Sequence, residues 1–319
     1  MIPELFKNNA GCHAYTARLQ SRRVSMPNTN PLHPEIVVVL TFRRFDVSTF
    51  FPPRYNPDMA NIRVTILRAP GINCDEETAH AWERAGARTR RIHINRLIEN
   101  PDLLLDDQIL TLPGGFSYGD DIAAGRILAN QLRRHLADAI QHLLDRGGLI
   151  LGICNGCQVL VRMGLLPGPD FPKAVSINQN DSGRYEDRWV HVRAEVSHCP
   201  FLCEGEFYHL PVAHGEGKFV VEDSSEHAVA LTKLHRIALR YVDRSGVPVA
   251  YPQNPNGSIE NIAGLVDLTG RVLGLMPHPE RCLVATHSPL QIRPINPENS
   301  LESPPDGLRL FRNAVRYLA

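Results

Sequence analysis

The most constraining feature of the chain is a cysteine between a predicted strand and a predicted helix. Residues 152–158 read Gly-Ile-Cys-Asn-Gly-Cys-Gln, directly after the apolar run 149–151 and directly before a helical pattern. This order predicts that Cys154 lies on a strand-to-helix elbow, with its sulfur beside the backbone N–H groups that open the helix. A helix N-terminus carries about half a positive charge, which favours a thiolate over a thiol. We therefore predict that Cys154 is a nucleophile at neutral pH.

Strand and helix patterns alternate along the part of the chain that leads to this elbow. The predicted elements are a strand at 63–67, a helix capped by Asn73 and Glu76, strands near 89–94 and at 109–112, a helix over 121–144 and a strand at 149–153. Such alternation predicts an α/β fold with a doubly wound, mostly parallel sheet flanked by helices. Ligands bind such sheets at the carboxyl ends of the strands, where Cys154 is placed.

The second half of the chain is richer in strand patterns. We predict additional strands at roughly 187–196, 218–222, 237–242, 262–267 and 271–276, and a closing helix that carries Leu308, Phe311, Val315 and Leu318 on one face. These strands extend the sheet beyond its alternating part.

Residues 1–58 differ from the rest of the chain in composition and in hydrophobic pattern. They contain many Pro and Asn residues and no sustained hydrophobic period. Such a segment buries too little apolar surface to offset an ordering entropy of about 1–2 kcal/mol per residue. We expect residues 1–58 to be either a disordered extension or the product of a mis-assigned upstream start. The folded domain is predicted to span 59–319.

The composition weighs against several classes of partner. Lys+Arg and Asp+Glu both number 34, so the formal net charge of zero gives no sign of nucleic acid or an anionic membrane as partner. The apolar run 36–40 is far too short to span a bilayer. The seven cysteines are odd in number and scattered, and no signal peptide pattern precedes them. We expect reduced thiols in a cytoplasmic protein.

A cysteine nucleophile needs a proton acceptor, and His278 is the best placed of the 14 histidines. It lies in Met-Pro-His-Pro-Glu, just past the predicted strand 271–276. Pro279 favours an extended conformation at His278. In an extended chain residues i and i+2 point the same way, so Glu280 can hold one imidazole nitrogen while the other faces the thiol. A proline-stiffened turn with a surface His–Glu pair is the structural alternative.

The third requirement is a set of donors for a developing oxyanion. Gly114 and Gly115 follow the strand 109–112, and their missing side chains let backbone N–H groups approach a ligand. The N–H of Asn155, next to the nucleophile, is the natural second donor. We predict that Gly115 and Asn155 form the oxyanion hole.

Two other readings of the cysteines compete with this one. Cys154 and Cys157 form a C-x-x-C pair at a helix N-terminus, as in dithiol oxidoreductases, although this pair comes late in the strand–helix pattern. Zinc could be held by His198, Cys199 and Cys203, or by the C-x-x-C pair with a histidine. No second C-x-x-C or H-x-H set completes four ligands, so we predict no metal site.

Taken together, the Cys154 elbow and His278-x-Glu280 resemble the class I, or triad, glutamine amidotransferases. Flanking phrases resemble one branch of that family, the glutaminase subunits of phosphoribosylformylglycinamidine synthase. The likeness runs from about 61 to 319, and residues 1–58 match nothing in the family. The phrases lie at 69–78, 113–121, 182–186, 211–217 and 276–281.

This resemblance implies a flavodoxin-like fold and hydrolysis of glutamine by a Cys154–His278–Glu280 triad. Gln158 resembles the residue that binds substrate glutamine, although it could instead brace the helix. Arg184 could hold the glutamine or form an interface ion pair. His214 and Glu216 form a second His-x-Glu, which we interpret as a turn that lines the pocket or the ammonia path.

The resemblance also implies partners. No Walker-type phosphate loop occurs in the chain, so no cofactor is expected on it. ATP and Mg²⁺ are expected on a synthetase subunit that receives the ammonia and converts formylglycinamide ribonucleotide to formylglycinamidine ribonucleotide. A small third subunit is a further possible partner. A redox or binding protein that uses the elbow cysteine without amide hydrolysis is the competing class.

Overall fold

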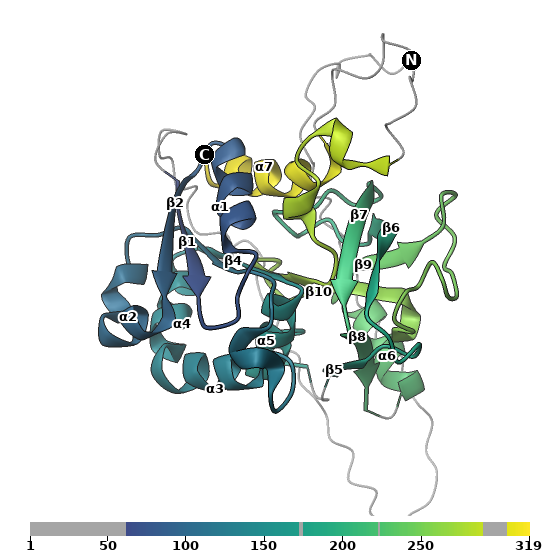
Figure 1. The fold of residues 1–319 in the computed structure, drawn as a ribbon, viewed down its shortest axis with the longest axis horizontal. Coiled ribbons are helices and arrows are strands. Elements are labelled where there is room, and N and C mark those ends of the chain that lie inside the picture. The colour runs from purple at the N-terminus through teal and green to yellow at the C-terminus, as the bar shows by residue number, and fades with distance from the viewer. Residues whose placement is uncertain (1–61, 172–174, 223, 290–304) are drawn as a thin grey trace, which may run out of the picture. The chain divides into compact units, whose positions relative to one another are not determined.

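A computed structural model describes residues 62–171, 175–222, 224–289 and 305–319 (Figure 1). Its main feature is a nine-stranded sheet in the order β2-β1-β3-β4-β11-β10-β9-β6-β7. The first five strands of this order pair in parallel, and the remaining pairs are antiparallel. Strands β5 and β8 form a separate two-stranded sheet. The predicted doubly wound, mostly parallel sheet with additional strands in the second half is confirmed.

In the first half the elements are β1 (Arg63–Arg68), α1 (Asp75–Arg84), β2 (Arg88–His93), α2 (Ile94–Glu99), β3 (Ile109–Leu112), the 3₁₀ helix η4 (Ser117–Asp120), α3 (Arg126–His135), α4 (Ala137–Asp145), β4 (Leu149–Ile153) and α5 (Asn155–Met163). In the second half they are β5 (Val175–Gln179), β6 (Glu186–Ala194), β7 (Phe207–His214), β8 (Glu216–Val221), α6 (Ser224–Lys233), β9 (Ile237–Val242), β10 (Ile262–Val266), β11 (Val272–Leu275), the 3₁₀ helix η6 (Pro279–Arg281) and α7 (Asp306–Leu318).

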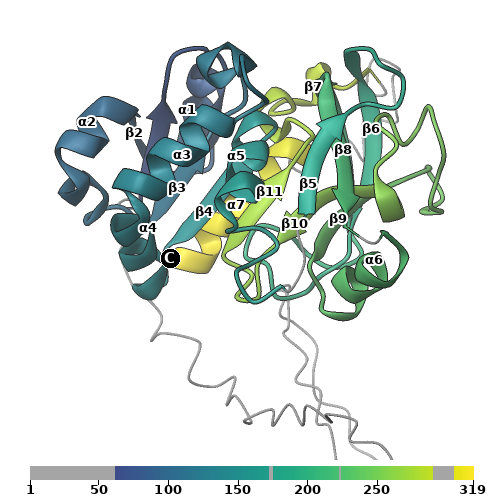
Figure 2. The same ribbon diagram turned by 90° about the horizontal axis from the view of Figure 1, so that it is seen from below.

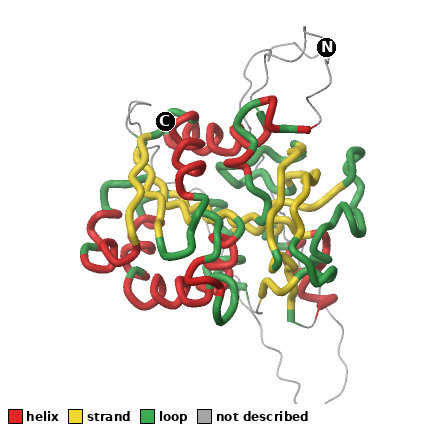
Figure 3. Tube along the Cα trace, in the orientation of Figure 1, coloured by secondary structure: helices red, strands yellow, loops and turns green. Residues whose placement is uncertain are grey.

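Helices cover both faces of the parallel part of the sheet. In Figure 1, α1 and α7 lie above it and α3, α4 and α5 lie below, and the view from below in Figure 2 places the latter three in front. Trp82 of α1 and Phe311 of α7 meet edge to face with ring centroids 4.9 Å apart, and both side chains are fully buried. Figure 3 shows that helices gather around the parallel strands, while the antiparallel half is mostly strand. Burial on both faces explains why β3 and β4 are continuous apolar runs.

The first half differs from the predicted elements in two local details. The helix predicted over 121–144 is two helices, α3 and α4, which meet at Leu136, a residue with non-helical φ of −127°. Apolar residues spaced four apart stay buried across this break, because both helices pack on the same face of the sheet: Leu128, Leu132, Leu136, Ile140 and Leu144. The predicted cap is also wrong: Cys74, not Asn73, is the N-cap of α1, and no side chain caps it. Three acidic residues in the first turn supply the favourable charge instead.

Two strands and two helices are absent from the sequence prediction. They are β5, β7, α2 and α6. Pro211 explains why β7 was missed, because proline inside an apolar run argues against a central strand. The structure resolves this conflict by placing β7 at the edge of the sheet, paired only with β6. Edge strands tolerate a residue that cannot donate a backbone hydrogen bond.

The prediction for residues 1–58 concerns a segment that lies outside the described residues. Within the described ranges, none of the helices combines the length and the apolar character needed to cross a bilayer. The structure records Cys74, Cys154, Cys157, Cys199 and Cys282 as free thiols.

Candidate active site

Three neighbouring parallel strands bring the predicted catalytic residues to one edge of the sheet. Strand β4 lies between β3 and β11, with Leu112 opposite Gly152 and Leu275 opposite Ile153. The chain therefore leaves β3 toward Gly114, β4 toward Cys154 and β11 toward His278 at the same level. The backbone N–H of Cys154 donates to the carbonyl of Leu275 at 2.8 Å, which joins the two ends directly.

The elbow at Cys154 has the strained backbone of a residue held out of a sheet. Its φ is +50° and its ψ is −105°, a conformation that non-glycine residues rarely adopt. Two glycines let α5 pack this closely. A Cβ on Gly156 would come 1.9 Å from the carbonyl oxygen of Leu112, and one on Gly152 would come 2.5 Å from Leu160 Cδ1. The predicted strand-to-helix elbow is confirmed as local geometry.

His278 and Glu280 form a buried pair, with Nδ1 and Oε1 2.6 Å apart. The backbone conformation that brings these two side chains together differs from the prediction. Strand β11 already ends at Leu275, the chain bends at residues 276–277, and residues Pro279–Arg281 form the 3₁₀ helix η6. Proline suits the first position of a helix because its φ is already fixed near the helical value. The tight turn, rather than an extended i, i+2 alignment, returns the carboxylate to the ring.

The electrostatics of the pair favour a charged imidazole. Burial alone would lower the pKa of His278, but the charge of Glu280 and the interaction with Cys154 outweigh it, so the pKa is raised well above its usual value. Because Nδ1 faces Glu280, Nε2 is the nitrogen left for the sulfur. Nε2 is buried and has no hydrogen bond of regular geometry within the described part of the chain, and Cys154 Sγ instead donates to the carbonyl of Ala213 at 3.6 Å. Such catalytic contacts are often long in free enzymes and tighten with substrate.

The two predicted oxyanion donors, Gly115 and Asn155, lie in segments that follow β3 and β4. Gly115 has φ of +135° and pairs with Ile72, and a Cβ there would come 2.8 Å from Asn73 N and Gly71 O. This crowding explains the glycine. Asn155 is the first residue of α5, where backbone N–H groups have no partner within the helix. Gly115 is thus held against residues 71–73, and the N–H of Asn155 directly follows the nucleophile.

Gln158 is buried and fully engaged by the protein. Its Nε2 donates to the carbonyl of Glu216 at 2.5 Å, and its Oε1 accepts from Asn155 Nδ2 at 2.9 Å. Asn155 in turn accepts from Ser117 N and donates to Asp120. These bonds tie the start of α5 to β8 and to η4. The structure places Gln158 beside the nucleophile, in the arrangement that the bracing alternative describes.

Arg184 lies on an exposed loop next to the site. Its carbonyl accepts from Asn180 Nδ2 at 2.9 Å, and its N–H donates to Ser182 Oγ at 3.3 Å. The following residue, Tyr185, was not predicted as part of the site. Burial raises the pKa of Tyr185, and the charge of Cys154 raises it further. The centroid of the Tyr185 ring is 6.4 Å from that of Phe116, and both rings are exposed.

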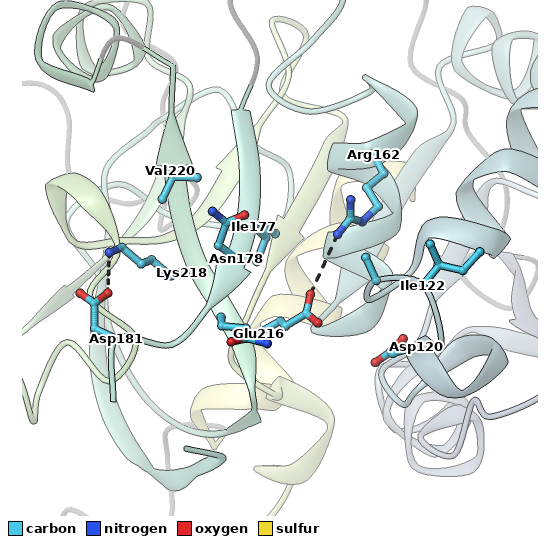
Figure 4. Close-up of a pocket in the computed structure, with 11 residues that line it drawn as sticks. Asp120, Ile122, Arg162, Ile177, Asn178, Asp181, Glu216, Lys218 and Val220 are labelled. Carbon is cyan, nitrogen blue, oxygen red and sulfur yellow. Dashed lines mark hydrogen bonds and ion pairs between the residues drawn. The ribbon is translucent and has the colours of Figure 1, made fainter. Parts of the chain in front are cut away.

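An open pocket of about 550 Å³ lies beside α5 (Figure 4). Charges of both signs line it: Arg162 lies 4.0 Å from Glu216, and Lys218 lies 2.5 Å from Asp181. Asp120 also faces it, and burial raises the pKa of this carboxyl. Cys154 is not among the lining residues. The pocket adjoins the predicted site residues through Asp120, which accepts from Asn155 Nδ2, and through Glu216, whose carbonyl accepts from Gln158 Nε2.

Cys74 is a second cysteine at the site that the sequence prediction missed. Arg281 Nη2 donates to its sulfur at 3.1 Å, and a Cβ on Gly114 would touch both this sulfur and the His278 ring. Donor atoms of Cys74, His278 and Glu280 lie within 4.8 Å of one another, and this is the one such group in the described ranges. These are zinc-type ligands. The Arg281 guanidinium against the sulfur disfavours a cation there.

The dithiol alternative receives no support from Cys157. This residue is fully buried, and burial raises the pKa of its thiol well above the ordinary value, with a further contribution from the charge of Cys154. A Cβ on Gly274 would come 2.8 Å from its sulfur. Cys157 is thus packed between α5 and β11 as a core side chain.

We predicted that the second His-x-Glu would be a turn. In the structure it is the junction between two strands. His214 is the last residue of β7, and Glu216 is the first residue of β8. Gly215 alone joins the two strands, which belong to different sheets. This change of sheet brings His214 into the interior, where it is 2% exposed.

Comparison with known proteins identifies the family of this chain. Residues 61–318 match the model of the CobB/CobQ-like glutamine amidotransferase domain. The phosphoribosylformylglycinamidine synthase subunit PurQ of Dehalococcoides mccartyi is 43% identical over 263 residues, which are 81% of this chain and 98% of that protein. PurQ of Archaeoglobus fulgidus is 38% identical, over 82% of this chain and 98% of that protein.

Among solved structures, PurLQS from Thermotoga maritima contains a chain with 34% identity and a TM-score of 0.59, covering 81% of this chain and 99% of that one. Family model, sequence and fold thus agree over nearly all of the described residues. The chain belongs to the CobB/CobQ-like glutamine amidotransferase family and, within it, to the PurQ subunits of phosphoribosylformylglycinamidine synthase.

Proposed function

We propose that this chain hydrolyses glutamine to glutamate and ammonia through a triad of Cys154, His278 and Glu280. One observation carries the proposal. Cys154 and His278 leave the adjoining ends of β4 and β11, and Glu280 holds the imidazole from the side opposite the sulfur at 2.6 Å. A nucleophile, a base and an orienting acid in this order are the parts that amide hydrolysis requires.

In the proposed reaction, Cys154 Sγ attacks the side-chain amide carbon of glutamine. His278 gives a proton to the departing nitrogen, so ammonia leaves and a glutamyl thioester remains. Water then attacks the thioester while His278 takes its proton, which releases glutamate and restores the thiol. Glu280 keeps the ring oriented and stabilises its positive charge in both steps.

The remaining predicted residues have supporting roles in this proposal. The N–H groups of Gly115 and Asn155 stabilise the tetrahedral oxyanion, each by about 3 kcal/mol in comparable sites. Arg184 lies at the edge of the site, where its exposed guanidinium can meet the α-carboxylate of glutamine. Gln158 supports the glutamine pocket by holding Glu216 and Asn155 in place.

We propose that the ammonia passes to a synthetase subunit. The curated relatives are named as subunits of phosphoribosylformylglycinamidine synthase, and the Thermotoga maritima structure is a PurLQS complex. The synthetase subunit would hold ATP and Mg²⁺ and convert formylglycinamide ribonucleotide to formylglycinamidine ribonucleotide during purine biosynthesis in the cytoplasm. A small third subunit is included as a further partner.

A glutaminase assay with and without the synthetase subunit tests this function. We expect glutamate to form from glutamine, faster in the complex than with the chain alone. Nucleotide product should form from glutamine only when both subunits are present, and from ammonium chloride with the synthetase alone. An absence of glutamate in both conditions would overturn the proposal.

The proposed domain boundary leads to a prediction about truncation. We expect a chain that begins at Met59 to match the full chain in thermal stability, solubility and glutaminase activity. The family match begins at residue 61, and β1 begins at Arg63. Circular dichroism melts and glutamate release measure the two forms. A truncated chain that fails to fold would contradict the boundary.

A further inference from the structure

His214 is a buried side chain that the proposed reaction does not use. It is 2% exposed, and its ring lies over the α-carbon of Gly217, where a Cβ would come 2.5 Å from ring atoms. The imidazole therefore occupies space that any side chain at position 217 would need. Buried polar side chains are normally hydrogen-bonded, so the partners of this ring need to be identified.

Hydrogen bonds fix the tautomer of this ring. Asn180 Nδ2 donates to the carbonyls of Arg184 and His214, at 2.9 and 2.8 Å. With its nitrogen held by two acceptors, Asn180 presents Oδ1 to His214 Nδ1, 3.1 Å away. Two acceptors cannot share a hydrogen bond, so Nδ1 carries the proton. In a neutral imidazole the other nitrogen, Nε2, is then a bare acceptor.

The ring also stays neutral at physiological pH. Burial lowers the pKa of His214 to about 3, and the nearby charge of His278 acts in the same direction. Nε2 is buried and has no hydrogen-bond partner among the residues that the structure describes. His214 therefore holds a lone pair in the interior with no donor from those residues.

This lone pair belongs to a segment that runs beside the reacting atoms. The carbonyl of Ala213 accepts from Cys154 Sγ, and the carbonyl of Pro211 accepts from the backbone N–H of His278 at 2.8 Å. His214 follows directly and interacts electrostatically with His278. The end of β7 thus holds an unpaired acceptor one residue beyond the carbonyl that accepts from Cys154 Sγ.

We propose that His214 Nε2 accepts a hydrogen bond from the nitrogen that leaves glutamine, either in the side-chain amide of bound glutamine or in the released ammonia. This inference rests on the proposed glutaminase function. Both species carry N–H donors, which an acceptor without a proton can bind. A neutral imidazole with Nε2 unprotonated has no proton there to donate, so ammonia bound to it stays a nucleophile. His214 is a positioning residue in this role.

Two substitutions test the hydrogen bond in the complex with the synthetase subunit. His214→Leu removes the acceptor, and His214→Gln keeps an acceptor oxygen. If the amide is the donor, His214→Leu should lower kcat/KM for glutamine about tenfold, the effect of one lost hydrogen bond. If ammonia is the donor, hydrolysis should stay normal while more than one glutamate forms per nucleotide product. His214→Gln should stay within about threefold of the wild type in both measurements.

Three measurements separate this inference from its alternatives. His209→Leu changes another histidine of β7, whose ring lies against Ser288 and Trp189, and should alter neither readout. Synthesis from ammonium chloride should be unchanged in all three variants. Glutaminase activity that survives Cys154→Ser would overturn the proposed function itself, whatever His214 does.

A spectroscopic experiment observes the protonation of the His214 ring directly. In protein labelled with ¹⁵N-histidine, His214 should show a protonated Nδ1 and an unprotonated Nε2, assigned by loss of the signals in His214→Leu. In a Cys154→Ser background, glutamine or ammonium chloride should shift the Nε2 resonance. A protonated Nε2 would overturn the proposal, as would a His214→Leu complex that matches the wild type in both kinetic readouts.

Discussion

Replacing Cys154 with serine should abolish glutamine-dependent synthesis by the complex while sparing synthesis from ammonium. A serine hydroxyl is not ionised at neutral pH, and the proposed covalent intermediate cannot form at a useful rate. Loss of the nucleophile from a triad enzyme lowers kcat by about 10⁴-fold or more. Ammonium-dependent synthesis occurs on the partner and should keep its full rate. Glutamate release and nucleotide product, measured in the same samples, distinguish the two activities.

Cys157→Ser is the matched control for this experiment. Cys157 is one helical turn from Cys154 but is fully buried, and burial keeps its thiol protonated by raising its pKa. We expect this variant to keep most of its glutaminase activity, with some loss of stability because a hydroxyl replaces a packed sulfur. Equal loss of activity in both variants would favour the dithiol mechanism instead.

Replacing His278 with alanine should remove nearly all hydrolysis, by about 10³-fold or more, because in the proposed reaction both proton transfers pass through its ring. Glu280→Gln should lose less, since an amide can still orient the imidazole, as the asparagine of Cys-His-Asn enzymes does. His214→Ala should be milder than either, because Nε2 of His214 offers only one hydrogen bond. Steady-state glutamate release at saturating glutamine ranks the three variants. A ranking in which His214→Ala is the most damaging would contradict the assignment of the base.

The pH profile of Glu280→Gln gives a second measure of the same pair. Burial lowers the pKa of His278, and the charge of Glu280 is the largest contribution that raises it. Removing this charge lowers the pKa, so the imidazole loses its proton at a lower pH. The alkaline limb of kcat/KM should move to lower pH in Glu280→Gln relative to the wild type. An unchanged limb would mean that the Glu280 charge does not set the protonation of His278.

Much of the fold follows from local patterns in the sequence. The strands 109–112, 149–153 and 237–242 were predicted with their observed bounds, because each is a short, largely apolar run and the first two adjoin a proline or a pair of glycines. The elbow at Cys154 was also predicted from the sequence, because a buried strand that is followed directly by a helix requires a sharp turn between the two. These features depend on neighbours within a few residues.

Features that depend on distant residues were missed or misassigned. The strand β7 contains Pro211, and only its place at the edge of the sheet makes that proline acceptable. The break at Leu136 and the 3₁₀ turn at Glu280 likewise reflect the surfaces on which these segments pack. Cys74 carries no motif that marks it, yet the fold places its sulfur beside the His278 ring.

The sequence by itself therefore determined the sheet type, the cysteine elbow and the identity of the His–Glu pair, because hydrophobic period, glycine and proline act over short distances. Only the tertiary structure decided which strand ends meet. The register of β4 against β11 sets Cys154 and His278 at the same level, and β7 returns to place Ala213 and His214 beside them. Register and crossover depend on contacts between residues far apart in the chain, such as Ile153 with Leu275 and Cys154 with Ala213, and no local pattern encodes a contact that only packing creates.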